Sequence, residues 1–459
     1  MTPMPDPLPA PPDPSPLLTD LYQLAMMQAY LAAGRVGTAS FEFFVRRLPP
    51  GRRFLVAAGL AQAVEWLQNL RFAPAELGWL RASGLFSPAL IDHLAALRFD
   101  GDVDAMPEGR VFFPDEPILR VTASLPLAQF VETRLVNLLH FQTVVATKAA
   151  HLRLCAPGRT LVDFGLRRAH GAEAGLFAAR AAYLAGFDGT ATLRAAAAWG
   201  IPAQGTMAHA FVQAFDDEPA AFLAFGAARP RDLVLLIDTY DSARAAARVV
   251  ALLPEFARHG VAVAGVRIDS GDLVAQARQV RRILDAGGLA HARIVASGGL
   301  DEDALVAHEA AGAPIDVYGI GTALTTSSDA PALDCAYKLQ DYAGVARRKL
   351  SPGKATWPGR KQVWRAYASD GTIASDTLSV EGDVRRGEAL LVPAMRRGVA
   401  VGAGLAGLDA ARRLCREDLA RLPGVARPGG AGGFAPDIAP ALMALAAATD
   451  ARIAQSAVR

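Results

Sequence analysis

Six short apolar runs between residues 158 and 330 each end in a cluster of polar residues and glycines, and a helical pattern follows each run. The clusters lie at 162–165, 201–206, 236–239, 266–271, 295–299 and 318–322. This alternation is typical of the βα units of a parallel sheet, in which ligands bind at the carboxyl ends of the strands. Turns between strands and helices do not by themselves require six clusters of polar residues and glycines at one edge of the sheet. The sequence therefore predicts an active site at this edge.

The most informative cluster is Arg267-Ile268-Asp269. Because side chains alternate along a strand, Arg267 and Asp269 are expected on one face and Ile268 on the other. A guanidinium can bind two phosphate oxygens at once, while a carboxylate can accept hydrogen bonds from ribose hydroxyls or hold magnesium. The pair therefore suits a phosphorylated sugar. An internal ion pair at the rim of the sheet is the alternative.

Two glycine clusters, Ser297-Gly298-Gly299 and Gly319-Ile320-Gly321-Thr322, have the composition of phosphate-binding loops. Glycine lets backbone N–H groups approach an anion, and a helix that begins after the loop adds its dipole. Barrels of βα units often bind a phosphate at their last two loops, which is where these clusters fall. Short glycine turns are common, so it is the consecutive pair that predicts a phosphorylated ligand.

One histidine, in Gly205-Thr206-Met207-Ala208-His209, is placed for chemistry. Thr206 is expected to cap the following helix, which would put His209 in its first turn. The helix dipole there disfavours an imidazolium and favours a negative group. A neutral imidazole that accepts a phosphoryl group fits this field, and a capping or core-packing histidine is the alternative.

The cluster Asp163-Phe164-Gly165-Leu166-Arg167-Arg168 places an aromatic ring and two guanidinium groups at one strand end. This combination suits a flat anionic ring, which Phe164 would stack on while an arginine binds its carboxylate. A core phenylalanine and solvent-exposed arginines are the alternative.

The fold that must position these residues is predicted to be α/β, an irregular TIM-like barrel with an additional α+β domain. We expect a disordered proline-rich tail over residues 1–16 and an N-terminal α+β domain over 17–150. The catalytic barrel is expected over 151–330, and a C-terminal segment, 331–459, would pack back on the N-terminal domain and the barrel.

Composition excludes several classes of function. Forty-seven basic residues against 45 acidic residues give a formal charge of +2, which is too even for non-specific nucleic-acid binding. The three cysteines are scattered, which argues against a disulfide framework or a thiolate zinc site. With no recognisable signal peptide and no long apolar stretch, we expect a cytoplasmic protein without a membrane partner.

In order and spacing, these motifs resemble the nicotinate phosphoribosyltransferases. The resemblance runs from Leu18-Thr19-Asp20-Leu21-Tyr22 to about Arg365 and includes the clusters above. It implies transfer of the phosphoribosyl group of 5-phosphoribosyl 1-pyrophosphate (PRPP) to nicotinate, in the salvage branch of NAD biosynthesis. It also implies a homodimer with active sites at the subunit interface.

The resemblance implies a role for each residue that matches the family's motifs. Phe164 would stack on one face of the pyridine ring, and Tyr22 of the partner subunit would cover the other face. Arg167 and Arg168 would lie near the nicotinate carboxylate, and Thr190 would contribute to the same site. Arg267 and Asp269 would hold the phosphoribosyl group. The 5′-phosphate would be bound by Gly298, Gly321 and Thr322, and Ser297 is a further substrate-binding candidate.

The same resemblance implies that ATP phosphorylates His209 and that hydrolysis of this phosphohistidine drives the transfer forward. Magnesium is expected to bind through the substrate pyrophosphate, with Asp269 as the candidate protein ligand. Asp238 and Asp269 would stabilise the cationic ribosyl group in the transition state. The pyridine nitrogen is already nucleophilic, so no general base is needed.

Substrate choice depends on the position after Gly189-Thr190. Relatives that use nicotinamide carry an aspartate there, which accepts from the amide N–H₂, whereas this chain has Ala191. The family's acid-using members usually have Ser-Asn at the two positions where this chain has Ala191-Thr192. Ala191 favours nicotinate over nicotinamide, the nearest alternative substrate. A barrel lyase or aldolase would need a strand-end lysine, and a non-catalytic phosphosugar sensor would lack His209, Arg267 or Asp269; the sequence matches neither.

Overall fold

The computed structural model describes residues 12–351, 353–402, 405–427, 429–430 and 433–457. They form two compact units, Lys148–Asp329 and the described residues of Pro11–Thr147 together with Ala330–Arg459. Most of the predicted tail, residues 1–11, lies outside the described residues. Within its remainder, the Ser15 hydroxyl donates to Glu76.

The unit Lys148–Asp329 is built on a six-stranded parallel sheet with the strand order β7-β6-β11-β10-β9-β8. Valines from three adjacent strands, Val162, Val295 and Val317, pack together with Phe164 against them. A parallel sheet covered on both faces requires such apolar strands. The strands are β6 (Thr160–Asp163), β7 (Gly189–Thr190), β8 (Leu233–Leu236), β9 (Val263–Ile268), β10 (Arg293–Ser297) and β11 (Val317–Ile320).

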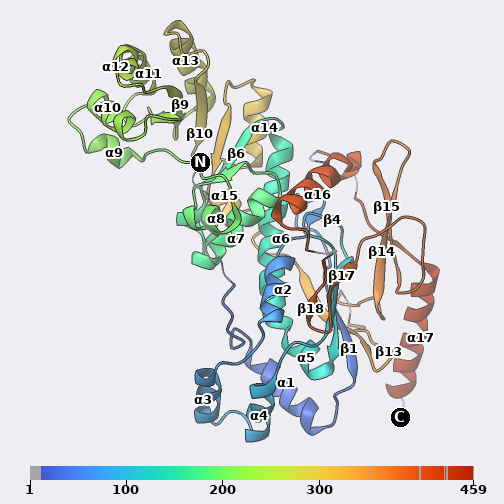
Figure 1. Ribbon diagram of the computed structural model, residues 1–459. Coiled ribbons are helices and arrows are strands. Elements are labelled where there is room, and N and C mark those ends of the chain that lie inside the picture. Colours follow the sequence, from blue (N-terminus) through green and yellow to red (C-terminus); the bar gives the residue numbers. More distant parts are fainter. Residues whose placement is uncertain (1–11, 352, 403–404, 428, 431–432, 458–459) are drawn as a thin grey trace. The chain divides into compact units, whose positions relative to one another are not determined.

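Helices connect these strands, and aspartates begin several of them. The side chains of Asp217, Asp241, Asp272 and Asp301 each accept a hydrogen bond from the backbone three residues on, which caps a helix N-terminus. Figure 1 shows α11 and α13 beside β9 and β10. The unit contains the end of α6 (Glu132–Cys155), η1 (Leu166–Arg168), α7 (Ala172–Leu184), α8 (Leu193–Trp199), α9 (His209–Gln213), α10 (Glu218–Ala228), α11 (Ser242–Ala251), α12 (Leu253–Arg258), α13 (Leu273–Ala286), α14 (Glu302–Ala310) and α15 (Thr322–Thr325).

One predicted strand, the run ending at 201–206, is not a strand. The sixth strand is the short β7, and 201–206 is a loop that joins the two edges of the sheet. Thr190 donates its N–H to Pro202 and accepts from the N–H of Gln204, and the Thr206 hydroxyl donates to Val234 of β8. Pro202 has no N–H, so the segment cannot form a regular ladder. The predicted irregular α/β barrel is confirmed. Its parallel strands form a half-barrel, and the loop 201–206 is hydrogen-bonded to both edge strands, β7 and β8.

The second unit combines the N-terminal and C-terminal segments in one antiparallel sheet, ordered β13-β12-β1-β5-β3-β17-β18. Strand β1 lies between β5, from the N-terminal segment, and β12, from the C-terminal segment. Its strands are β1 (Thr38–Val45), β3 (Asp102–Ala105), β5 (Pro117–Ser124), β12 (Cys335–Tyr342), β13 (Val345–Ala346), β17 (Val392–Arg396) and β18 (Val399–Ala400). The additional α+β unit expected from the sequence is therefore present.

A smaller sheet in the same unit, ordered β16-β14-β15-β19, is anchored by a buried arginine. Arg365 is fully buried and forms ion pairs with Asp376 at 2.6 Å and Asp418 at 3.2 Å. Figure 1 shows α17 beside the β14–β15 hairpin. These strands are β14 (Lys361–Tyr367), β15 (Ile373–Val380), β16 (Glu388–Ala389) and β19 (Asp437–Ile438), and β2 (Leu55–Val56) pairs with β4 (Val111–Phe112). The unit's helices are α1 (Leu21–Ala32), α2 (Leu60–Gln68), α3 (Pro74–Ser83), α4 (Pro88–Ala96), α5 (Leu125–Phe130), most of α6, α16 (Leu408–Ala420) and α17 (Pro440–Ala457).

Candidate active site

Two cavities adjoin at the carboxyl ends of the parallel strands. The first has a volume of about 440 Å³ and the second about 490 Å³, and both are lined by Phe164, Arg167, Arg267 and Asp269. Of the other predicted residues, the first cavity includes Arg168, Ser297, Gly298, Gly321 and Thr322, and the second includes Thr190 and His209. Eleven of the thirteen predicted site residues thus line one continuous region, and Asp238 and Tyr22 are the exceptions.

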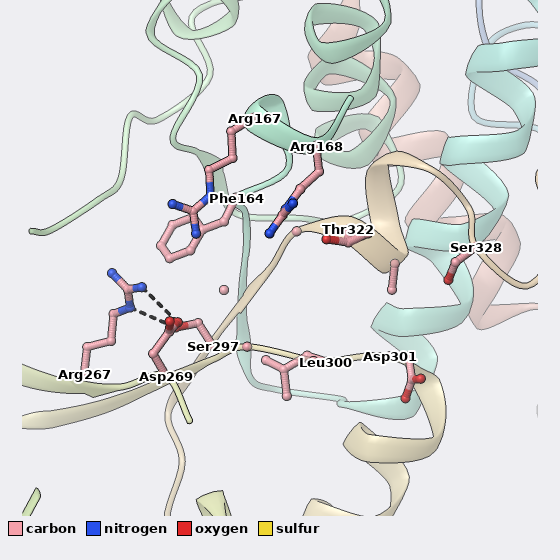
Figure 2. Close-up of a pocket in the computed structure, with 15 residues that line it drawn as sticks. Phe164, Arg167, Arg168, Arg267, Asp269, Ser297, Leu300, Asp301, Thr322 and Ser328 are labelled. Carbon is pink, nitrogen blue, oxygen red and sulfur yellow. Dashed lines mark hydrogen bonds and ion pairs between the residues drawn. The ribbon is translucent and has the colours of Figure 1, made fainter. Parts of the chain in front are cut away.

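A network centred on Arg267 lies where the cavities meet (Figure 2). Its Nη2 donates to Asp269 Oδ1 at 2.9 Å and its Nε donates to the Ser297 hydroxyl oxygen at 2.8 Å. Its Nη1 donates to the Met207 carbonyl at 3.1 Å, and the Ser297 hydroxyl donates to Asp269. Arg267 and Asp269 therefore lie on the same face, as predicted, and form an ion pair that lines both cavities.

Asp269 stays ionised in this network. Burial alone would raise the pKa of its carboxyl, but the hydrogen bonds from Ser297 and Arg267 and the nearby positive charges outweigh burial and lower the pKa. The carboxylate is therefore available to a cationic group in the cavity.

Asp238 is placed behind Asp269, not among the residues that line either cavity. Its Oδ2 accepts from the Asp269 N–H and the Ser270 hydroxyl, both at 2.8 Å. Within the described residues its Oδ1 is buried and has no hydrogen-bond partner. Asp238 therefore fixes the strand-end turn that carries Asp269.

Phe164 packs tightly against the sheet at the bottom of the site. The Arg267 guanidinium lies over its ring, 5.6 Å from the centroid. A Cβ built at Gly319 on β11 would lie 2.5 Å from Cε2 of the ring, so this position must be glycine for the ring to lie where it does. Together, these contacts fix the plane on which a substrate ring would stack.

Arg167 and Arg168 extend from η1 into the opening above Phe164 (Figure 2). Both side chains are exposed, and in the described part of the chain neither makes an ion pair or a side-chain hydrogen bond. Two uncompensated guanidinium groups therefore face the cavity, as a site for an anionic ligand requires.

The glycine-rich turn after β10 is shaped by its contact with β9. Gly298 has φ +87°, and a Cβ there would lie 2.0 Å from the Asp269 carbonyl oxygen. The turn can therefore approach the Asp269 strand end only with glycine at this position. Thr322 begins α15 directly after Gly321, so backbone N–H groups are free at that end of the first cavity.

His209 is the first residue of α9, but its cap differs from the prediction. Ala208 occupies the N-cap position and no side chain caps the helix, while the Thr206 hydroxyl donates to the Val234 carbonyl of β8. The imidazole nevertheless faces the second cavity: Nδ1 is 3.2 Å from the Thr239 hydroxyl oxygen, and Nε2 is 3.7 Å from Asp269 Oδ2. The side chain is 37% exposed, so a ligand can reach it.

Asp163 has a part in the site that could not be assigned from the sequence. It is almost fully buried, and it accepts from the Gly165 N–H at 2.8 Å and the Thr190 hydroxyl at 2.7 Å. Burial raises the pKa of its carboxyl, although the two hydrogen bonds oppose the shift. Asp163 thus ties the Phe164 turn to β7, and the hydroxyl of Thr190 is directed at Asp163 instead of solvent.

Tyr22 lies in α1, in the other unit. Its ring is half exposed, and its hydroxyl donates to Glu132 at 3.3 Å. A contact with a partner subunit stays a prediction.

Among the described residues, no three acidic, histidine or cysteine side chains group closely enough to hold a metal ion. The described helices also contain none that is both long and apolar enough to cross a membrane.

Two family models match the chain. The N-terminal domain of nicotinate phosphoribosyltransferase (NAPRTase) matches residues 17–140, and the NAPRTase family matches residues 159–347. The chain belongs to the nicotinate phosphoribosyltransferase family. It is therefore a phosphoribosyltransferase.

Known nicotinate phosphoribosyltransferases match this chain over most of their own length. The nicotinate phosphoribosyltransferase pncB2 of Mycobacterium tuberculosis is 48% identical over 89% of this chain and 87% of its own. The nicotinate phosphoribosyltransferase of Bacillus subtilis is 41% identical over 76% of this chain and 72% of its own. The crystal structure of human nicotinic acid phosphoribosyltransferase has a TM-score of 0.84 at 31% identity, covering 94% of this chain and 99% of that one.

Proposed function

We propose that this enzyme transfers the phosphoribosyl group of PRPP to nicotinate, giving nicotinate mononucleotide and pyrophosphate in the salvage branch of NAD biosynthesis. We propose further that ATP hydrolysis, through a phosphohistidine at His209, is coupled to the transfer. The observation that supports this best is the junction of the two cavities. There an aromatic ring, a cation and an ionised carboxylate lie together at Phe164, Arg267 and Asp269.

In the transfer step, the pyridine nitrogen forms a bond to the anomeric carbon of the ribose. The bond from that carbon to the pyrophosphate oxygen breaks, and its electron pair leaves with pyrophosphate. Arg267 would stabilise the growing negative charge on the leaving group, and Asp269 would face the cationic ribosyl group. Because the pKa of Asp269 is lowered, this residue is ionised at neutral pH.

The first cavity would bind the 5′-phosphate. Free backbone N–H groups follow Gly321, Thr322 offers a hydroxyl, and the turn at Ser297-Gly298 after the neighbouring strand β10 lines the same cavity. Arg168 reaches the same opening and would add its charge. This is the arrangement in which strand-end loops bind phosphate.

Nicotinate would stack on Phe164 with its carboxylate toward Arg167, and Ala191 lines the adjoining wall. No carboxylate is present at position 191 to repel the acid or to accept from an amide. Tyr22 of a partner subunit would cover the ring, which makes a homodimer part of the proposal.

Magnesium would be held by the Asp269 carboxylate, which lines both cavities at the end of β9. Asp238 lines neither cavity, and its hydrogen bonds from the Asp269 N–H and the Ser270 hydroxyl hold the turn that carries this carboxylate. Mg²⁺ prefers such oxygen ligands, supplemented by substrate phosphates. When bound, it would neutralise pyrophosphate charge.

ATP coupling is supported by the position of His209 in the second cavity, where its imidazole is exposed beside Arg267 and Asp269. An imidazole nitrogen would form a bond to the γ-phosphorus of ATP while the bond to the departing ADP oxygen breaks. Water would later hydrolyse the phosphohistidine and release inorganic phosphate.

Radiolabelled ATP tests the coupling. Wild type should acquire an acid-labile phosphate and His209→Ala should not. His291→Ala, which changes an exposed histidine outside both cavities, should label like wild type. Equal labelling of wild type and His209→Ala would contradict the assignment.

Incubation with PRPP, magnesium and either nicotinate or nicotinamide, followed by identification of the mononucleotide, tests the transfer itself.

A further inference from the structure

Arg229 is a cation of the second cavity that the proposed reaction leaves without a role. The cavity is lined by three arginines, Arg167, Arg229 and Arg267, together with His209. Among its described lining residues Asp269 is the only carboxylate, and Asp269 is already paired with Arg267 at 2.9 Å. The cavity therefore has an excess of positive charge and suits a ligand with several negative charges.

The backbone of Arg229 is held firmly, at the end of α10. Its N–H donates to the Phe225 carbonyl at 2.8 Å, and the Phe225 ring packs edge-on against Phe211 of α9, with 5.4 Å between ring centroids. The buried Glu218 at the start of α10 forms an ion pair with Arg248 of α11. This packing fixes where the Arg229 side chain begins.

The Arg229 guanidinium itself is free. The residue is exposed, and in the described part of the chain its side chain makes neither an ion pair nor a hydrogen bond. A guanidinium on a fixed backbone, with all its donors available, is well suited to bind phosphate oxygens in pairs.

The two cavities differ in which phosphate groups they can take. Arg229 and His209 line the second cavity and are absent from the residues that line the first. A donor that phosphorylates His209 places its terminal phosphate in the second cavity, whose lining also includes Arg229. We propose that Arg229 binds the polyphosphate chain of this donor, a nucleoside triphosphate, an inference that depends on the proposed phosphohistidine chemistry.

The pyrophosphate of PRPP has the same chemistry as that chain, so the test needs two arms. The first arm measures how His209 labelling and ATP hydrolysis depend on ATP concentration. The second measures the KM for PRPP, and inhibition by inorganic pyrophosphate, in nicotinate transfer without ATP. The variants are Arg229→Ala, Arg229→Lys and the matched control Arg231→Ala, which removes an exposed arginine outside both cavities.

Arg229→Ala should raise the half-saturating ATP concentration roughly tenfold, the usual effect of losing a hydrogen bond to a charged group. This increase should exceed any change in the KM for PRPP. Arg229→Lys should recover part of the loss, and Arg231→Ala should match wild type.

Three results would overturn the inference. Unchanged ATP dependence in Arg229→Ala, with wild type labelled normally, overturns it and leaves the proposed function standing. An equal or larger rise in the KM for PRPP assigns Arg229 to pyrophosphate instead. A wild-type protein that takes no label from ATP overturns the phosphohistidine proposal and this inference together.

Discussion

Ser297 on β10 and Arg267 on β9 are joined across the sheet by a hydrogen bond of 2.8 Å from the Arg267 Nε to the Ser297 hydroxyl oxygen. The same hydroxyl donates to Asp269, so one buried serine holds both charged groups of the site. Arg267 and Asp269 alternate correctly along their strand, but alternation does not fix the rotation of a long side chain. The neighbouring strand supplies that constraint.

Ser297→Ala should therefore lower kcat/KM for PRPP about tenfold, because Arg267 and Asp269 each lose a hydrogen bond that orients them. The free energy of unfolding should fall by about 1.5–3 kcal/mol, because both hydrogen bonds involve charged groups. Steady-state kinetics and chemical denaturation measure the two effects. Ser375→Ala, on β15 and outside both cavities, is the control and should change neither. Similar kinetic losses in both variants would show that the Ser297 bonds do not position the pair.

Gly319→Ala should displace the Phe164 ring, since the added methyl would lie 2.5 Å from ring atom Cε2. We expect the KM for nicotinate to rise about tenfold, in the range that loss of an aromatic contact produces. The KM for PRPP should change less. Gly78→Ala provides the control, because a Cβ there meets nothing within 4 Å. A Gly319→Ala enzyme with wild-type nicotinate KM would rule out Phe164 as the stacking surface.

Ala191→Asp should reduce kcat/KM for nicotinate by at least about tenfold, since a carboxylate at this exposed, cavity-lining position repels the acid. Ala191→Asn has nearly the same shape without the charge, and it should cause a smaller loss. The same assays with nicotinamide should show a relative gain for Ala191→Asp. Equal losses in the two variants would mean that size, not charge, decides at position 191.

Much of the half-barrel could be predicted because its evidence is local. A buried parallel strand appears in the sequence as a short apolar run, and five of the six runs predicted to be strands are strands in the structure. The exception, 201–206, contains Pro202 and is bonded to β7 and β8, which are both distant in sequence. Strand β7 itself has two residues, too few to show any periodicity.

The site was predictable wherever a polar residue directly follows a strand, as Arg267, Asp269 and Ser297 illustrate. It was not predictable where a long-range partner decides the role. Thr206 is a residue type that often caps helices, but the helix begins at His209 with Ala208 as its N-cap, and the Thr206 hydroxyl donates to a carbonyl of β8. Asp163 gains its function from Thr190, 27 residues later in the chain. Arg229 lies at the end of helix α10, a position that no strand-end pattern marks.

Asp163 also gives the enzyme a pH-dependent cost in stability. Burial raises the pKa of its carboxyl above the ordinary value of 3.8, even though Thr190 and Gly165 donate to it. Between 3.8 and the raised value, the native protein binds more protons than the unfolded chain. Stability contributed by this group is therefore greatest at low pH and is lost as the pH rises through that window.

Asp163→Asn removes this titration while nearly preserving shape and the hydrogen bond from Thr190. The difference in thermal midpoint, variant minus wild type, should therefore rise with pH across the window. Asp370→Asn is a control of opposite sign, because a backbone hydrogen bond from Thr372 lowers the pKa of Asp370. For that variant the same difference should fall as the pH rises toward 3.8, below the Asp163 window. Calorimetric scans of the three proteins at matched pH values decide the matter, and a flat or falling difference for Asp163→Asn would show that Asp163 is not a buried carboxyl with a raised pKa.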